Sequence, residues 1–277
     1  MNHIHWYPGH IAKAEKQLKE KLGLVDVIIE VVDARLPLSS KYPNIEKLIG
    51  NKPRLTVLNK SDLADGDYFA KWINIFKSYG CPVLMINSVS GKDFSKVIST
   101  IIKLGEPAIK KLTSKGLLPR PIRVMVIGMP NVGKSSFINK LIKRQKTKTG
   151  AKAGVTKQQQ WVRINEKIDL LDTPGIIPLR QDNQNAAYKL AIVNSIGENA
   201  YDTVFVAEFF LKNISKKYSD KIKNHYKIEG ELTLENIAKS RNWVIQNGET
   251  DIGRCAIYVL KDFRDGRFGR MTLDELT

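Results

Sequence analysis

Short apolar, β-branched runs alternate with amphipathic stretches over the first two-thirds of the chain. Six runs have the length and composition of strands: residues 26–32, 55–58, 83–86, 123–127, 160–164 and 167–171. Strands that alternate with helical patterns predict βαβ units, a mostly parallel sheet and helices on both of its faces. The last two runs predict a pair joined by a tight turn at Asn165 and Glu166. We therefore expect an α/β fold.

The pattern changes near residue 183. Beyond it, apolar residues recur at helical spacing, as in AAYKLAIVNSI (186–196) and IGRCAIYVLKDF (252–263). This predicts two domains, an α/β domain over 1–182 and a small helical domain over 183–277. The amphipathic run 12–22 predicts a helix that packs antiparallel to the strand at 26–32, so that its beginning returns to the carboxyl ends of the strands.

Charge adds a probable class of partner to this picture only through its excess and its distribution. The 277-residue chain has a net charge of +17, which favours a polyanion such as nucleic acid or an anionic membrane surface. Residues 1–182 carry +16 of it. We find no apolar run long enough for a membrane span and no signal-peptide pattern, and expect a cytoplasmic protein. Cys81 and Cys255 lack metal-site spacing and are expected to be buried thiols.

The strand at 123–127 runs into GMPNVGKSS (128–136), which fits the GxxxxGK[ST] pattern of a phosphate-binding P-loop and opens a helical run. Glycines let such a loop wrap a phosphate chain with its N–H groups pointing inward. Lys134 would bring its charge to the β- and γ-phosphates, and Ser135 its hydroxyl to Mg²⁺. The nucleotide-binding residues predicted here are Asn131, Val132, Gly133, Lys134, Ser135 and Ser136.

Two further segments fit the γ-phosphate side of such a site. The strand at 167–171 ends in DTPG, where Asp172 can hold Mg²⁺ through water and the amide of Gly175 can meet the γ-phosphate. Thr156, between the P-loop and DTPG, has the position of a switch threonine that would bind Mg²⁺ and assist catalysis. Its alternative is an ordinary loop threonine.

The strand at 55–58 leads into NKSD (59–62), which predicts which base is bound. The Asp62 carboxylate can accept two hydrogen bonds, from N1–H and the amino group of guanine, and adenine cannot supply that pair. Asn59 can reach the other edge of the base, and the stem of Lys60 can cover its face. Ser61 completes the motif, and Asn87 and Ser88 could contact the base oxygen through their backbone. The alternative for NKSD alone is a helix N-cap.

The order of these motifs is permuted relative to Ras-type GTPases, in which the P-loop comes first. Every motif still ends a strand, so all of them can meet on one rim of the sheet. Together with WYPGH (6–10), DARLP (33–37) and the closing DFRDGRFGRMTLDE (262–275), they resemble the ribosome biogenesis GTPase A (YlqF) family over nearly the whole chain. The fold expected is thus a circularly permuted P-loop GTPase domain followed by a helical domain.

The resemblance implies a GTPase that acts late in assembly of the large (50S) ribosomal subunit, is stimulated by that subunit, and contacts rRNA through its helical domain. GTP would be the substrate and Mg²⁺ the cofactor, and we expect a monomer with no membrane partner. The alternative is a GTP-dependent RNA-binding scaffold with negligible hydrolysis. Asn131 also resembles P-loops of K⁺-stimulated GTPases, although an asparagine there is often only a turn residue.

The remaining candidates concern hydrolysis and RNA. Ile176 follows DTPG where Ras-type enzymes have the glutamine that orients water, and an aliphatic side chain cannot do that. His10 would begin the helix that returns to the nucleotide rim, and the resembled family assigns the matching histidine a hydrolytic role; its alternative is a solvated helix-start residue. For RNA we expect contacts from a basic loop within residues 140–167, which hold nine basic residues and one acid, and from Arg264, Arg267 and Arg270.

Overall fold

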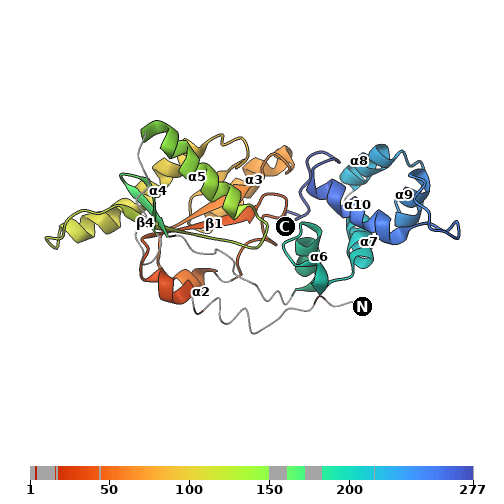
Figure 1. Ribbon diagram of the computed structural model, residues 1–277. Helices are drawn as coiled ribbons and strands as arrows, with labels where there is room; N and C mark the ends of the chain where they lie inside the picture. Colours follow the sequence, from red (N-terminus) through yellow and green to blue (C-terminus); the bar gives the residue numbers. More distant parts are fainter. Residues whose placement is uncertain are drawn as a thin grey trace.

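The structure, a computed structural model, describes residue 4, residue 16 and residues 18–43, 45–149, 161–171, 183–214 and 216–276. An α/β layer lies at one end of the molecule and a group of helices at the other, with the C-terminus between them (Figure 1).

The sheet has six strands in the order β3-β2-β1-β4-β6-β5. They are β1 Val27–Asp33, β2 Arg54–Asn59, β3 Val83–Met85, β4 Ile122–Ile127, β5 Trp161–Asn165 and β6 Ile168–Leu171. All neighbours pair in parallel except β5 and β6, which form the predicted antiparallel pair. Their turn is at residues 166 and 167, one position later than expected, because the Asn165 side chain accepts a hydrogen bond from the Lys167 amide (2.9 Å). The prediction of a mostly parallel α/β sheet is confirmed.

Helices cover both faces of this sheet. The helices α4 (Phe94–Thr113) and α5 (Lys134–Thr149) lie on one side, and α2 (Ile45–Ile49) on the other (Figure 1). On β2, Leu58 packs with Trp72 of α3 (Phe69–Ser78), which follows the short 3-10 helix η1 (Gly66–Tyr68). Alternate residues of β1 and β2 therefore serve opposite faces, which explains why β1 is buried along its whole length.

Two expectations about the ends of helices need comment. The helix predicted over 12–22 is present at its described residues, 16 and 18–22, where Leu18 and Leu22 join the core. The helix α5 runs to Thr149, so residues 143–149 of the expected basic loop are helical instead. Its earlier residues continue the helix that the P-loop opens, because the run contains no glycine or proline before Gly150.

The chain beyond 183 is helical, with one isolated β-bridge between Val244 and Thr250 among its described residues. Its elements are α6 Gln184–Ile192, η2 Glu198–Ala200, α7 Thr203–Asn213, α8 Lys216–Tyr226, α9 Leu234–Ser240 and α10 Ile252–Arg264. Side-chain oxygens accept hydrogen bonds from first-turn amides at the starts of four of them: Asn183, Asp202, Thr233 and Asp251. The domain boundary at 182/183 stays a prediction.

The helices join the core of the sheet domain through apolar contacts. Phe210 of α7 stacks on Phe263 of α10 with ring centroids 5.0 Å apart, and both belong to the same buried cluster as β1 and β4. Cys81 and Cys255 are buried free thiols, as expected. In the described part of the chain, no helix combines the length and apolar character needed to cross a bilayer.

Packing between α4 and β4 gives a test of this architecture. A Cβ added at the buried Gly105 would lie 2.4 Å from Cγ2 of Ile122. We expect Gly105→Ala to lower the free energy of unfolding by about 1–3 kcal/mol, since the overpacked core must shift. Urea unfolding measures this.

The matched control is Gly253→Ala in α10, where the same Cβ would meet no atom closer than 3.8 Å. That change should raise the free energy of unfolding by about 0.5–1 kcal/mol through helix propensity alone. If both variants are stabilised, the close packing of α4 on β4 is wrong.

Candidate functional site

Four strands deliver the predicted motifs to one rim. The carboxyl ends of β1, β2, β3 and β4 are adjacent in the sheet and lead into Asp33, NKSD, Asn87–Ser88 and the P-loop respectively. In parallel sheets this edge is where ligands bind, so the permuted chain order does not prevent the motifs from meeting.

The P-loop has the backbone that its glycines allow. Gly128 has φ 153° and Gly133 has φ 94°, both in the region that favours glycine. A Cβ at Gly128 would lie 2.3 Å from the carbonyl oxygen of Val31, and one at Gly133 would lie 2.3 Å from Nδ2 of Asn59. The loop therefore lies too close to β1 and to NKSD for any side chain at these two positions.

Lys134, Ser135 and Ser136 form the first turn of α5. The Lys134 ammonium is buried and donates a 2.5 Å hydrogen bond to the Met129 carbonyl, across the mouth of the loop. Burial lowers the pKa of Lys134 to about 8. A phosphate at this position would replace the carbonyl and favour the charged form. Ser135 and Ser136 are exposed at the start of the helix, where an anion and its counter-ion would lie.

Asn59 links three loops of the rim. Its Nδ2 donates to the carbonyl of Val132 (2.9 Å), and its Oδ1 accepts from both N–H (3.2 Å) and Oγ (2.7 Å) of Ser88. Asn59 and Ser88 are both buried. We expected Asn59 to reach the base; an asparagine amide has two hydrogens, so this linking role leaves the second one for that contact.

Lys60 connects the guanine motif to the P-loop. Its Nζ donates to the carbonyl of Asn131 (2.5 Å) and to Oδ2 of Asp33 (2.8 Å), so its stem crosses the site. Asp33 is fully buried, and Arg35 donates to it from Nε (3.0 Å) and Nη2 (2.8 Å). Burial opposes ionisation, but Arg35 and Lys60 outweigh it and hold the pKa of Asp33 well below its usual range.

The rest of the predicted base site is open. Ser61 donates its amide to the carbonyl of Ile86 (3.2 Å), which joins NKSD to the end of β3. Asp62 is half-buried beside it. The Asn87 side chain accepts from the amides of Val89 (2.8 Å) and Ser90 (3.1 Å) and so shapes its own turn. That turn leaves the backbone of Asn87 and Ser88 facing the rim, consistent with the predicted backbone contacts.

The structure tests the remaining candidates unequally. His10, Thr156, Asp172 and Gly175 lie outside the described residues. Asn131 has the turn conformation that an asparagine tolerates (φ 57°), and its Nδ2 donates to the carbonyl of Asn194 at the end of α6 (2.5 Å). This bond gives Asn131 a structural role, and a K⁺ dependence stays a prediction.

The prediction of an RNA contact is wrong for Arg264. Its guanidinium donates to the carbonyls of Ile192 (2.9 Å) and Ala191 (3.0 Å), the last ones of α6, and to the hydroxyl of Tyr201 (3.1 Å). These unpaired helix-end carbonyls need donors, which is why a basic residue is bound there. Arg267 and Arg270 are exposed, and for them the prediction is untested.

Sequence reasoning used DARLP only as part of a resemblance and missed Asp33 and Arg35 as site residues. The signal was present, because an acid and a base directly after a fully apolar strand must be buried together or not at all. Residues 194 and 195 were also missed: Ser195 Oγ donates to the carbonyl of Pro130 in the P-loop (2.8 Å). No local pattern marks a turn between two helices as part of a phosphate loop's surroundings.

Comparison with known proteins agrees with this site. The family model for 50S ribosome-binding GTPases matches residues 123–240. A "Ribosome biogenesis GTPase A" from Bacillus cereus is 40% identical over 276 residues, which cover 98% of this chain and 93% of that protein. A GDP-bound YlqF structure has a TM-score of 0.66 at 27% identity and covers 94% of this chain and 98% of its own. For GNP-bound YlqF from T. maritima the values are 0.64, 26%, 95% and 98%.

The ion cluster of Asp33 makes a stability prediction. We expect Asp33→Asn to lower the free energy of unfolding at pH 7 by about 3–5 kcal/mol, because Arg35 and Lys60 lose their buried counter-charge. The folded pKa of Asp33 lies below the unperturbed 3.8, so its contribution is complete above that pH and is lost as pH falls further. The gap between the two proteins should therefore narrow below about pH 4.

Urea unfolding over a pH series measures this gap. The control is Glu235→Gln, which breaks an exposed pair with Lys239 on α9 and should cost less than about 0.5 kcal/mol. Equal effects of the two substitutions would mean that the Asp33 cluster is not a buried, tightly paired one.

Proposed function

The chain belongs to the ribosome biogenesis GTPase A family and is a GTPase; from this premise we propose that it acts at a late step of large (50S) subunit maturation, binds rRNA, and hydrolyses GTP when that subunit stimulates it. The observation that carries the proposal is the joining of P-loop, NKSD and Asn87–Ser88 by Asn59 and Lys60 at one rim. Such a rim binds a guanine nucleotide in a set orientation.

In this proposal the base and phosphates are bound by different parts of the rim. Asp62 accepts hydrogen bonds from N1–H and the amino group of guanine, and the stem of Lys60 covers its face. Backbone amides from Asn131 to Ser136 enclose the phosphates, and Lys134 places its charge on them. The burial of Lys134 strengthens this interaction because little water screens it.

The residues that would hold Mg²⁺ fit that ion. Ser135 offers an exposed hydroxyl next to Lys134 at the helix start, and oxygen ligands are what Mg²⁺ prefers. The strand β6 runs parallel to β4 with Leu170 beside Val124, so Asp172, just after β6, leaves the sheet next to the P-loop strand. When bound, Mg²⁺ neutralises charge on the β- and γ-phosphates. Thr156 and the amide of Gly175 would complete this side.

Water activation is assigned to His10, since Ile176 cannot orient a nucleophile. A neutral imidazole would accept a hydrogen bond from the attacking water. Binding of rRNA is supported by the charge of +17, of which residues 140–167 form a dense part. The proposal places this activity in the cytoplasm, in a monomer.

Base recognition gives the first test. Asp62→Asn replaces one carboxylate acceptor by a donor, so the affinity for GTP should fall by roughly 10² or more, while the affinity for xanthosine triphosphate rises. Competition against a fluorescent GDP analogue measures both. Glu106→Gln, an exposed change on α4, is the control and should leave both affinities unaltered. Intact GTP affinity in the Asp62 variant would remove this residue from the base site.

Turnover with and without isolated large subunits gives the second test. We expect strong stimulation in the wild-type protein, and His10→Ala should cut the stimulated rate by about 10² or more while leaving GTP binding within about threefold. The nearby His5→Ala is the control and should turn over normally. A normal rate for His10→Ala would make His10 a helix-start residue only. Negligible wild-type turnover on subunits would instead support the GTP-dependent RNA-binding scaffold.

A further inference from the structure

The last described residues of the chain lie against the back of the guanine motif. We call Arg270–Glu275 the C-terminal segment; it follows α10 and returns to the sheet domain, where the C-terminus lies between the two parts of the molecule (Figure 1). Met271, Thr272 and Asp274 are buried there. A chain end that is this well buried is held by specific contacts.

Three of these contacts hold the residues that carry and follow Asp62. Arg270 donates from Nε to the carbonyl of Asp62 itself (3.2 Å), and the Met271 amide donates to the carbonyl of Leu63 (3.0 Å). The Asp65 amide donates to Oγ1 of Thr272 (3.1 Å). The backbone on which Asp62 stands is thus anchored by residues more than 200 positions away in the chain.

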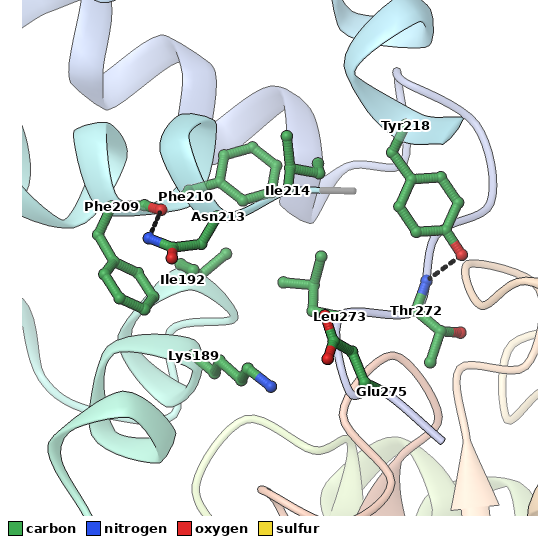
Figure 2. Close-up of a pocket in the computed structure, with 10 residues that line it drawn as sticks. All are labelled: Lys189, Ile192, Phe209, Phe210, Asn213, Ile214, Tyr218, Thr272, Leu273 and Glu275. Carbon is green, nitrogen blue, oxygen red and sulfur yellow. Dashed lines mark hydrogen bonds between the residues drawn. The ribbon is translucent and has the colours of Figure 1, made fainter. Parts of the chain in front are cut away.

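The helix α8 strengthens the same attachment. The Asp65 carboxylate accepts from the hydroxyl of Tyr218 (2.8 Å) and from Nζ of Lys217 (2.7 Å). Figure 2 shows that the Tyr218 hydroxyl also meets the amide of Thr272, at 3.3 Å, beside the groove that the segment forms with α6 and α7. Asp65 and Thr272 therefore belong to one network with the helical part.

Asp274 fixes the other end of the segment. Its Oδ2 accepts from the amides of Leu38 and Ser39 (both 2.8 Å), and its Oδ1 accepts from the Ser39 hydroxyl (2.6 Å) and from Lys189 (3.1 Å). The preceding Leu273 amide donates to the carbonyl of Arg35 (2.8 Å). The segment thereby reaches the loop that supplies Asp33, the counter-charge of Lys60.

We propose that the C-terminal segment sets the selectivity of the site for guanine, with Thr272 and Asp274 as positioning residues that hold the loop of Asp62 against the base. The inference rests on the proposed role of Asp62. Two simultaneous hydrogen bonds from one carboxylate to N1–H and the amino group demand close placement, and a loop released from its anchors loses the second bond first.

The test compares GDP with inosine diphosphate, which keeps N1–H but lacks the amino group. Thr272→Val keeps the shape of the side chain and removes the acceptor of the Asp65 amide. We expect GDP affinity to fall about fivefold and inosine diphosphate affinity to change less than about twofold, which shrinks their ratio. Thr272→Ser retains the hydroxyl and should restore the wild-type ratio. A merely structural role would weaken both nucleotides equally.

Asp274→Asn approaches the same loop from the other end and should shrink the ratio in the same direction. Its charge-matched control is the exposed Glu229→Gln, which should leave the ratio unchanged. Titration calorimetry measures the affinities, and thermal unfolding identifies any variant that does not fold; with one lost, the other decides. Wild-type discrimination that survives both Thr272→Val and Asp274→Asn overturns the inference. Equal wild-type affinities for the two nucleotides would overturn the role of Asp62 instead.

Discussion

The buried carboxylate of Asp33 is the constraint on which the rest of the site depends. A carboxylate without solvent is tolerated only if charged donors surround it, and here Arg35 and Lys60 supply three of them. Because Lys60 also binds the P-loop carbonyl of Asn131, the cluster fixes the distance between the phosphate loop and the guanine motif. Because Arg35 donates to the carbonyl of Arg264 (3.3 Å), the same carboxylate also orients the end of α10.

The P-loop has a second support, and it comes from the helical part. Asn131 and Pro130 are bonded to Asn194 and Ser195, which form the turn after α6, and Arg264 closes the end of that helix. In the permuted order the γ-phosphate segment leads directly towards α6. A change at the phosphates therefore has a short physical route to the helices, and the route becomes allosteric if the two nucleotide states differ in these contacts.

Much of this was predictable because the signals are local. The strands at 26–32 and 123–127 are apolar runs with β-branched residues, and each is within one residue of its observed position. GMPNVGKSS and NKSD follow their strands directly, so their place on the rim follows from the rule that parallel strands end at one edge. Residues 143–149 were misassigned because a basic run resembles a loop, whereas the propensity of lysine and arginine continues a helix already begun.

The sequence by itself determined which chemistry the chain carries: a P-loop, a guanine motif and a permuted order that still allows them to meet. Only the tertiary structure decided how these loops are held. Arg35 meets Arg264 and Asp274 meets Leu38 across separations of 229 and 236 residues, and a pairing over such a distance leaves no periodicity in the sequence. Whether Arg264 faces RNA or the end of α6 depends on which carbonyls the fold leaves without a donor, and that is known only once the helices have packed.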